Sequence, residues 1–276
     1  MAHPQIAVFA RLADGNEARL RAIEGQATML GRTMHAIAYD PVHDEIVVPQ
    51  QFGQGVLTFA GSASGEATPK RVIQGPRTQL IALDRLGVDP VNNEIWVPEG
   101  QKVLVFPREA NGDVAPIRTL SGPATRIGAA RSVAIDAARN LVVVVGAPPD
   151  TGDREERRRR GAELTIFDRT ANGNVKPKRV ISGIPGNGNV AVSSELGLIF
   201  VVVDTYVGVW SIDDDGEVAP RFTIGGPNGV LQDPRGVSLD PKNQAVIVSD
   251  KQLNAVLTFH VPEIYNRKAT DQAARR

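Results

Sequence analysis

The chain has 276 residues, of which 42% are hydrophobic and 22% are charged, and this composition excludes disorder over most of its length. Its 31 lysine and arginine residues balance its 31 aspartate and glutamate residues, so no net charge attracts it to nucleic acid or to an anionic membrane. The absence of cysteine excludes disulfides, thiolate metal sites and cysteine nucleophiles.

The first element expected is a short strand over residues 6–10. This apolar run is too short for the core of a signal peptide, and no basic segment precedes it. The longest apolar run, Leu141 to Val145, is far shorter than the roughly 20 residues of a membrane-spanning helix. We therefore expect a cytoplasmic protein without a membrane span.

The strand at residues 6–10 is the first copy of a pattern in which an aromatic residue follows an aliphatic residue by three positions. The pattern occurs six times, at Ile6/Phe9, Val56/Phe59, Val103/Phe106, Leu164/Phe167, Val207/Trp210 and Val256/Phe259. We interpret each copy as a short strand whose aromatic residue belongs to the core.

A polar turn follows five of these strands, at residues 14–16, 64–66, 111–113, 172–174 and 215–217. Each turn has glycine beside Asn, Asp or Ser, which is typical of a hairpin. The return strand ends in a glycine two residues after an aliphatic residue, at Ile23/Gly25, Ile73/Gly75, Leu120/Gly122, Ile181/Gly183 and Ile224/Gly226. Successive glycines are 50, 47, 61 and 43 residues apart, so the chain repeats, and the longest unit holds an insertion.

Two more strands are expected between each glycine and the next aromatic strand. They are clearest at residues 236–241 and Ala245 to Asp250. Four strands per unit are typical of a propeller blade, and we number them first to fourth, so that the aromatic strand is the third. The turn between the first and second strands contains a recurring aspartate, which we expect to close the turn with its own side chain, at Asp40, Asp89, Asp136 and Asp240.

The segments Pro234 to Asp240, Val246 to Asp250 and Asn254 to Phe259 together resemble the NHL repeat. The resemblance covers residues 6–260 and identifies a fold family, not an activity. The chain departs from the NHL pattern at Ser193, which replaces the aspartate, and at residues 144–146, which replace the polar end of a second strand.

We therefore predict an all-β propeller of four-stranded antiparallel blades. It would form a single domain over residues 1–261, followed by a polar tail over residues 262–276. The chain has five first strands but six third strands. The propeller could therefore have five or six blades, and we favour five. The ring would close by pairing of the N- and C-terminal strands, which would hide the sheet edges.

The resemblance implies that ligands bind at the mouth of the central channel, where first strands begin and second strands end. These positions hold His35, Arg85, Glu99, Arg131, Asn189, Asp204, Arg235 and Asp250. The three arginines could bind an anion, because guanidinium groups hold carboxylate and phosphate in a bidentate manner. Alternatively, they could pair with carboxylates of neighbouring blades and hold the ring together.

Some six-bladed relatives are metal-dependent lactonases in which carboxylate and amide oxygens hold a calcium-like ion. The matching donors here would be Glu99, Asn189, Asp204 and Asp250. Three arginines in the same ring would repel a divalent ion, so we predict no metal, no cofactor and no catalytic residue. A lactonase-like hydrolase and a small-anion binding protein remain as alternatives.

The insertion between Gly146 and Glu163 contains Arg154 and four successive arginines, Arg157, Arg158, Arg159 and Arg160. Such a patch suits an acidic protein or another anionic surface, although nearby carboxylates would neutralise much of it. The leading hypothesis is therefore a non-enzymatic protein-interaction scaffold with a protein partner. It could be an accessory subunit of a larger, membrane-associated assembly, and we expect no sequence-specific binding of nucleic acid.

Overall fold

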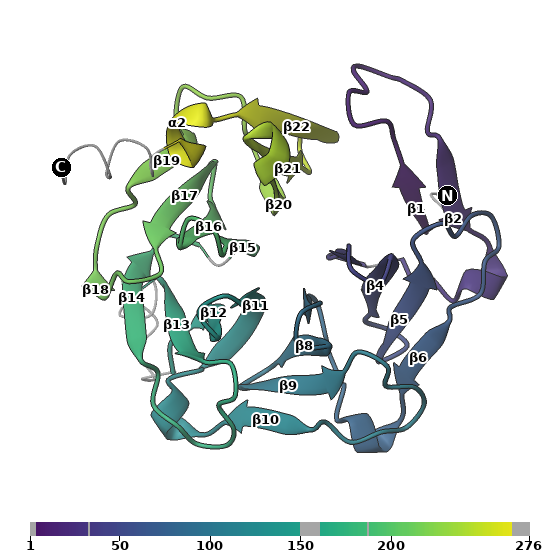
Figure 1. Cartoon of the computed structure of the whole chain (residues 1–276), viewed down its shortest axis with the longest axis horizontal. Coiled ribbons are helices and arrows are strands. Elements are labelled where there is room, and N and C mark those ends of the chain that lie inside the picture. Colours follow the sequence, from purple (N-terminus) through teal and green to yellow (C-terminus); the bar gives the residue numbers. More distant parts are fainter. Residues whose placement is uncertain (1–3, 33, 150–160, 187, 267–276) are drawn as a thin grey trace. The chain divides into compact units, whose positions relative to one another are not determined.

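The computed structural model of the protein describes residues 4–32, 34–149, 161–186 and 188–266. Nearly all regular structure in this part of the chain is β (Figure 1). The sheets follow one another in chain order and their long strands pair antiparallel. The predicted fold class is confirmed: the chain is an all-β propeller with five blades of four-stranded antiparallel type.

Four sheets contain strands at all four positions of the repeat. The first consists of β3 (Ala38–Asp40), β4 (Glu45–Gln50), β5 (Gly55–Ala60) and β6 (Arg71–Gln74). The second consists of β7 (Gly87–Asp89), β8 (Glu94–Glu99), β9 (Lys102–Pro107) and β10 (Arg118–Ser121). The third consists of β11 (Ala129–Asp136), β12 (Leu141–Ala147), β13 (Ala162–Asp168) and β14 (Arg179–Ile184), with the short β18 (Gly216–Glu217) at its edge. The fourth consists of β15 (Val190–Ser193), β16 (Leu198–Val203), β17 (Tyr206–Ser211) and β19 (Phe222–Gly225).

Strands near the two chain ends hold the remaining positions of the repeat. Strand β1 (Gln5–Val8) pairs with β2 (Arg21–Glu24), and these are third and fourth strands. Strands β20 (Pro234–Asp240), β21 (Ala245–Asp250) and β22 (Ala255–His260) form a sheet of first, second and third strands. After β22 the chain enters the short helix α2 (Pro262–Tyr265) of the predicted tail, and its Ile264 is buried. The pairing expected between the two chain ends stays a prediction.

The contacts of the chain divide it into two compact units. One comprises Met1–Glu99 and Leu104–Thr119, and the other Gly100–Val103 and Leu120–Arg276. The single domain predicted over residues 1–261 stays a prediction. Within the described residues, no helix has the length and apolar character needed to cross a bilayer.

The aromatic residues of the third strands form core where the sheet is complete. Phe59, Phe106, Phe167 and Trp210 are at most 1% exposed, as predicted. Phe9 is 51% exposed, so the prediction that it belongs to the core is wrong. It follows β1, whose sheet has only two strands, and fewer neighbours are available to cover its ring.

One side chain closes the turn between the first and second strands. Asp40 Oδ1 accepts hydrogen bonds from the backbone N–H groups of Val42 and His43 at 2.9 and 3.0 Å. Ser193, which replaces the aspartate in one repeat, accepts from the N–H of Leu196 at 3.3 Å. Equivalent bonds to the remaining aspartates confirm the predicted turn role, at Asp89, Asp136 and Asp240.

The polar turn after a third strand also joins its sheet to the preceding one. Gly65 forms a parallel bridge to Ile23, and Gly112, Gly173 and Gly216 contact the preceding fourth strands in the same way. The next side chain adds a bond: Asp113 Oδ1 accepts from the N–H of Arg77 at 2.7 Å. The hairpin interpretation of the sequence missed this second role.

A buried threonine shapes the chain as it leaves three of the fourth strands. The hydroxyl of Thr78 donates to the carbonyl of Gly75 at 2.6 Å and accepts from the N–H of Leu80 at 3.2 Å. Thr28 and Thr125 make the same pair of bonds. Since the residue after each threonine has a positive φ, the hydroxyl supports a sharp turn toward the next first strand.

We expect Thr78→Val to lower the free energy of unfolding by about 1–3 kcal/mol, because the buried N–H of Leu80 loses its acceptor and the carbonyl of Gly75 keeps only its bond from the N–H of residue 78. Urea unfolding followed by circular dichroism measures this change. Thr78→Ser keeps the hydroxyl and is the matched control. An equal loss in both variants would show that packing of the methyl group, and not the hydroxyl, stabilises the turn.

Glu45, at the start of β4, is a buried carboxylate held by three cations. It accepts hydrogen bonds from Lys70 Nζ at 2.7 Å, from Arg108 Nη1 at 2.8 Å and from Arg71. Burial raises the pKa of Glu45, but the hydrogen bonds from Arg71, Lys70 and Arg108 outweigh it and lower the pKa to about 2.

Glu45→Gln should therefore destabilise the protein at neutral pH and cost less in acid. Because the folded-state pKa lies below the ordinary value of 4.5, the stabilisation is complete above that pH and is lost as the pH falls toward 2. At neutral pH it amounts to about 3 kcal/mol. Urea unfolding at neutral pH and near pH ~3 tests this.

The control is Glu24→Gln, which removes an exposed ion pair with Arg19 and should cost less than about 1 kcal/mol. A destabilisation of Glu45→Gln that does not change with pH would contradict the charge argument.

Candidate functional site

The eight predicted channel-mouth residues lie where first strands begin and second strands end. His35, Arg85 and Asn189 precede the first strands β3, β7 and β15, while Arg131 and Arg235 lie in β11 and β20. Glu99 and Asp250 are the last residues of β8 and β21, and Asp204 follows β16. The positions expected from the repeat are therefore those seen, and the contacts of each side chain decide what it can do.

Asp84 links His35 to Arg85 in the first unit. The Nδ1 atom of His35 contacts one oxygen of Asp84, and Arg85 Nη1 lies 3.4 Å from the other. The imidazole side chain is 53% exposed, whereas the side chains of Asp84 and Arg85 are 23% and 11% exposed. The sequence analysis missed Asp84, although an acidic residue directly before Arg85 at the start of a first strand was a usable signal.

Asn189 connects first strands in the second unit. Its Oδ1 accepts from the N–H of Val237 at 3.3 Å, and its Nδ2 lies 3.5 Å from Ser132 Oγ. The N–H of Val190 donates to the same hydroxyl at 3.2 Å. These contacts join β11, β15 and β20, so Asn189 and the previously missed Ser132 hold neighbouring strand starts together.

Glu99 is bound to the loop that precedes β7. It is 6% exposed, and its oxygens accept from the N–H groups of Ile81 and Ala82 at 3.0–3.1 Å. These bonds use both carboxylate oxygens. Glu99 is therefore a support for the loop that carries Asp84 and Arg85.

Asp250 supports the loop before β20 in the same manner. It accepts from the N–H groups of Gln232 and Asp233 at 2.7 and 3.0 Å and from Leu253 at 3.0 Å. Burial raises the pKa of Asp250, but these backbone hydrogen bonds outweigh it and hold the pKa below its ordinary value. The carboxylate is thus ionised at neutral pH and already surrounded by donors.

The other charged candidates are exposed. Arg131 is exposed, and the Arg235 side chain is 54% exposed, with Nη2 3.1 Å from Asp233 Oδ2. Asp204 is exposed and adopts a φ of 25°. Arg85 pairs with Asp84 and Arg235 pairs with Asp233, so the two arginines do not share a carboxylate.

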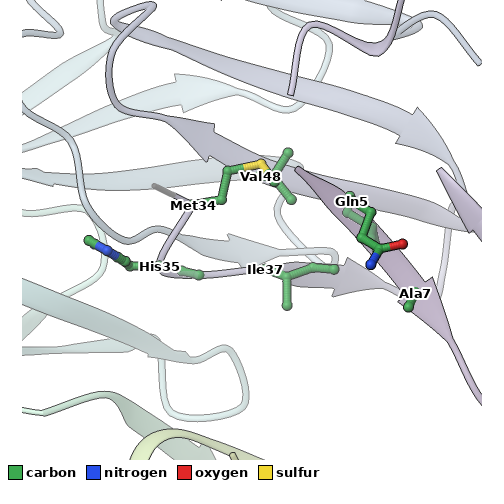
Figure 2. Close-up of a pocket in the computed structure, with 8 residues that line it drawn as sticks. Gln5, Ala7, Met34, His35, Ile37 and Val48 are labelled. Atoms are coloured by element: carbon green, nitrogen blue, oxygen red, sulfur yellow. The ribbon is translucent and has the colours of Figure 1, made fainter. Parts of the chain in front are cut away.

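A pocket of about 300 Å³ lies beside β1. Its walls are Gln5, Ile6 and Ala7 of β1, residues 34–37 before β3, and Val48 of β4. Figure 2 shows Gln5 and Ala7 on one side and Met34, Ile37 and Val48 across from them, with the His35 ring directed away from β1. The side chains across from β1 are apolar, so the pocket suits an apolar segment better than a charged ligand.

Within the residues that the structure describes, no three His, Asp or Glu side chains gather closely enough to hold a metal ion. The predicted partner-binding residues Arg154, Arg157, Arg158, Arg159 and Arg160 lie outside the described residues. The assigned contacts of Glu99 and Asp250 favour a structural role for two of the four oxygen donors that the lactonase alternative requires.

Glu99→Ala should lower the melting temperature because it leaves the N–H groups of Ile81 and Ala82 without acceptors, at a cost of about 1–3 kcal/mol. Differential scanning fluorimetry with and without a chelator measures the effect. Glu99→Gln keeps one acceptor oxygen and should lose less. A wild-type melting temperature that falls with chelator to the level of Glu99→Ala would instead indicate a metal bound by Glu99.

Comparison with protein-family models found no match, and comparison with curated protein sequences found none either. Among solved structures, the chain is similar to Kuenenia stuttgartiensis hydrazine synthase, with 12% sequence identity and a TM-score of 0.56. The match covers 78% of this chain and 55% of that chain, so the protein spans about half the length of the structure it resembles. At this identity the likeness shows the propeller fold alone.

Proposed function

We propose that the protein is a non-enzymatic interaction scaffold built from NHL-type repeats, which binds a protein partner through the face where its first strands begin. The observation that carries this proposal is that some polar side chains at these strand ends bind backbone groups, whereas others are exposed. The carboxylates of Glu99 and Asp250 accept hydrogen bonds from backbone N–H groups, whereas Arg131 and Arg235 lie in first strands and are exposed to solvent. Rigid strands that present exposed cations can recognise an acidic protein surface.

The alternative of a lactonase-like hydrolase is less well supported by these contacts. A hard cation needs several free oxygen donors directed at one point. The oxygens of Glu99 and Asp250 are directed at loop backbone, and the Asn189 oxygen accepts from Val237. A small-anion binder that uses Arg85, Arg131 and Arg235 is a second alternative, and the aspartates beside Arg85 and Arg235 would compete with an anion.

The role as an accessory subunit of a larger assembly, and a cytoplasmic location, are further parts of this proposal. The accessory role rests on the run of arginines and on the polar tail of the sequence, and the location is carried over from the sequence analysis. In such an assembly the propeller would hold its partner without performing chemistry on it.

Charge reversal on the first strands tests the proposal. Wild-type protein, purified gently from its native cell and cross-linked, should carry a stoichiometric protein partner. Arg131→Glu combined with Arg235→Glu should reduce partner recovery about tenfold or more, because repulsion replaces attraction at an interface. Lys176→Glu combined with Lys242→Glu changes the charge equally at exposed positions outside β11 and β20 and is the control.

Recovery of the wild-type protein alone, with one bound divalent ion, would overturn the scaffold in favour of the hydrolase. The same assay on a variant with Arg157, Arg158, Arg159 and Arg160 replaced by glutamate asks whether the insertion contributes. Partner recovery unchanged in that variant would remove the insertion from the proposed interface and leave the first-strand face.

A further inference from the structure

Three exposed apolar side chains lie on adjoining loops at the end of the sheet β3–β6 where its second strand ends. They are Met29 in the loop before β3, Phe52 in the turn between β4 and β5, and Ile81 in the loop before β7. Their exposed fractions are 44%, 74% and 63%. All three residues belong to the first compact unit, and we call them the Phe52 patch.

The sheet that carries Phe52 has strands of its own unit on both sides. On one side Gly65, in the turn after β5, bridges to Ile23 of β2. On the other side Ile73 of β6 bridges to Gly112, in the turn after β9. These four residues all lie in the first compact unit, which thus supplies the neighbours of the sheet by itself.

Two glutamine side chains hold the three loops of the patch together. Gln50 Nε2 donates to the carbonyl of Met29 at 3.3 Å, and Gln54 Nε2 donates to the carbonyl of Ile81 at 3.2 Å. Gln50 Oε1 also accepts from the N–H of Gly53 in the turn. The patch is therefore arranged before any partner arrives, which lowers the entropic cost of binding.

The fold does not require an aromatic residue at position 52. The turn between β21 and β22 has the same length as the turn between β4 and β5. It also has a positive φ at the same place, with 50° at Asn254 and 54° at Gln54. Where the first turn has Phe52, this second turn has Gln252. A polar side chain therefore suits the turn, and the exposed ring needs another explanation.

Met29 and Ile81 also stand where other repeats have polar residues or glycine. Met29 follows its buried threonine with a φ of 60°, and the corresponding residues Gln79 and Arg126 have a φ of 61°. Ile81 stands two residues after Gln79, and the corresponding residues of the other two loops are Gly31 and Gly128. All three members of the patch are thus apolar at places where the repeat accepts polar or small residues.

The loops around the patch carry more cationic than anionic side chains. Arg32 and Arg77 are exposed and stand within four residues of Met29 or Ile81 in the sequence. The sequence of these loops contains one carboxylate, Asp84, which pairs with Arg85, while Glu99 from β8 is buried. Phenylalanine, methionine and arginine are enriched in interfaces, and exposed arginines complement an acidic partner.

We propose that the Phe52 patch docks a segment of a partner protein in which aliphatic or aromatic side chains are flanked by carboxylates. The apolar side chains would cover Phe52, and the carboxylates would pair with Arg32 and Arg77. An apolar centre surrounded by charged groups is the arrangement that concentrates binding energy in protein interfaces. The inference rests on the proposed scaffold function, because it specifies the chemistry of the partner that is held.

The probe is a labelled peptide with tryptophan and leucine at its centre and aspartates on both sides. Fluorescence anisotropy should show that the whole wild-type protein binds it. Replacing the two central residues by serine, or the aspartates by lysine, should weaken binding about tenfold or more. The first change removes the apolar contact, and the second replaces attraction to the arginines by repulsion.

Phe52→Gln should weaken binding of the acidic peptide to a similar extent, and glutamine is the residue that the β21–β22 turn already carries. Val91→Gln is the matched control, because Val91 is 69% exposed and lies in the turn between β7 and β8, outside the loops of the patch. Arg77→Glu should also weaken binding, whereas Arg11→Glu makes the same change of charge at an exposed position outside these loops.

Equal binding of the three peptides, or no binding of any of them, would overturn the inference. Equal effects of Phe52→Gln and Val91→Gln would do so too. Recovery of a stoichiometric partner from the native cell would still support the scaffold in each of these cases, so the two proposals fail separately.

Sedimentation distinguishes a partner segment from two other occupants of the patch. The proposal expects a monomer that does not bind vesicles of phosphatidylserine and phosphatidylcholine. Binding to these vesicles that Phe52→Gln abolishes would show that the patch meets a membrane. A dimer that Phe52→Gln dissociates would show that it meets a second copy of the chain, and either outcome would overturn the proposal.

Discussion

The structure depends on the burial of its strands on both faces, which no single sheet of this size can achieve alone. Three core clusters make this dependence visible, because each combines strands from successive repeats. The polar turns add a second connection: Gly112 bridges back to Ile73, and Asp113 holds the backbone at Arg77. The core cluster and the polar turn therefore connect the same pair of sheets. Each sheet is stabilised by its contact with the next one.

The repeat made much of this predictable. Strands recur with the same aliphatic and aromatic spacing, and turns recur with the same aspartate, so local chemistry determines both. The error at Phe9 has a definite origin: its local pattern is the same as that of Phe59, and only the number of neighbouring strands differs. The repeat pattern predicts which residues have the side chains of a core, whereas their burial depends on whether neighbouring strands are present to cover them.

The candidate site shows the same limit. The repeat predicted that Glu99 and Asp250 end second strands, but a carboxylate at that position can be directed at a channel or at a loop. Two backbone N–H groups of each loop donate to the carboxylate, and these bonds direct it at the loop. Asp84 and Ser132 join first strands through contacts that are distant in sequence, which one-dimensional spacing does not encode. The carboxylates of Glu99 and Asp250 are thus satisfied by backbone groups, while Arg131 and Arg235 are exposed.

The uncovered positions also follow from the repeat. Val256 in β22 is 70% exposed, while the equivalent Val56, Val103 and Val207 are fully buried, and β22 has no fourth strand in the described chain. Ile37 is 57% exposed, whereas Leu86, at the same place in the next repeat, is 6% exposed and belongs to one core cluster with Val47 of β4. Edge strands of monomeric proteins are commonly protected by charged residues or proline, yet β1 and β22 contain neither. The local sequence at both positions is that of a buried residue, so the exposure of these residues reflects the number of strands in their sheets and not their own chemistry.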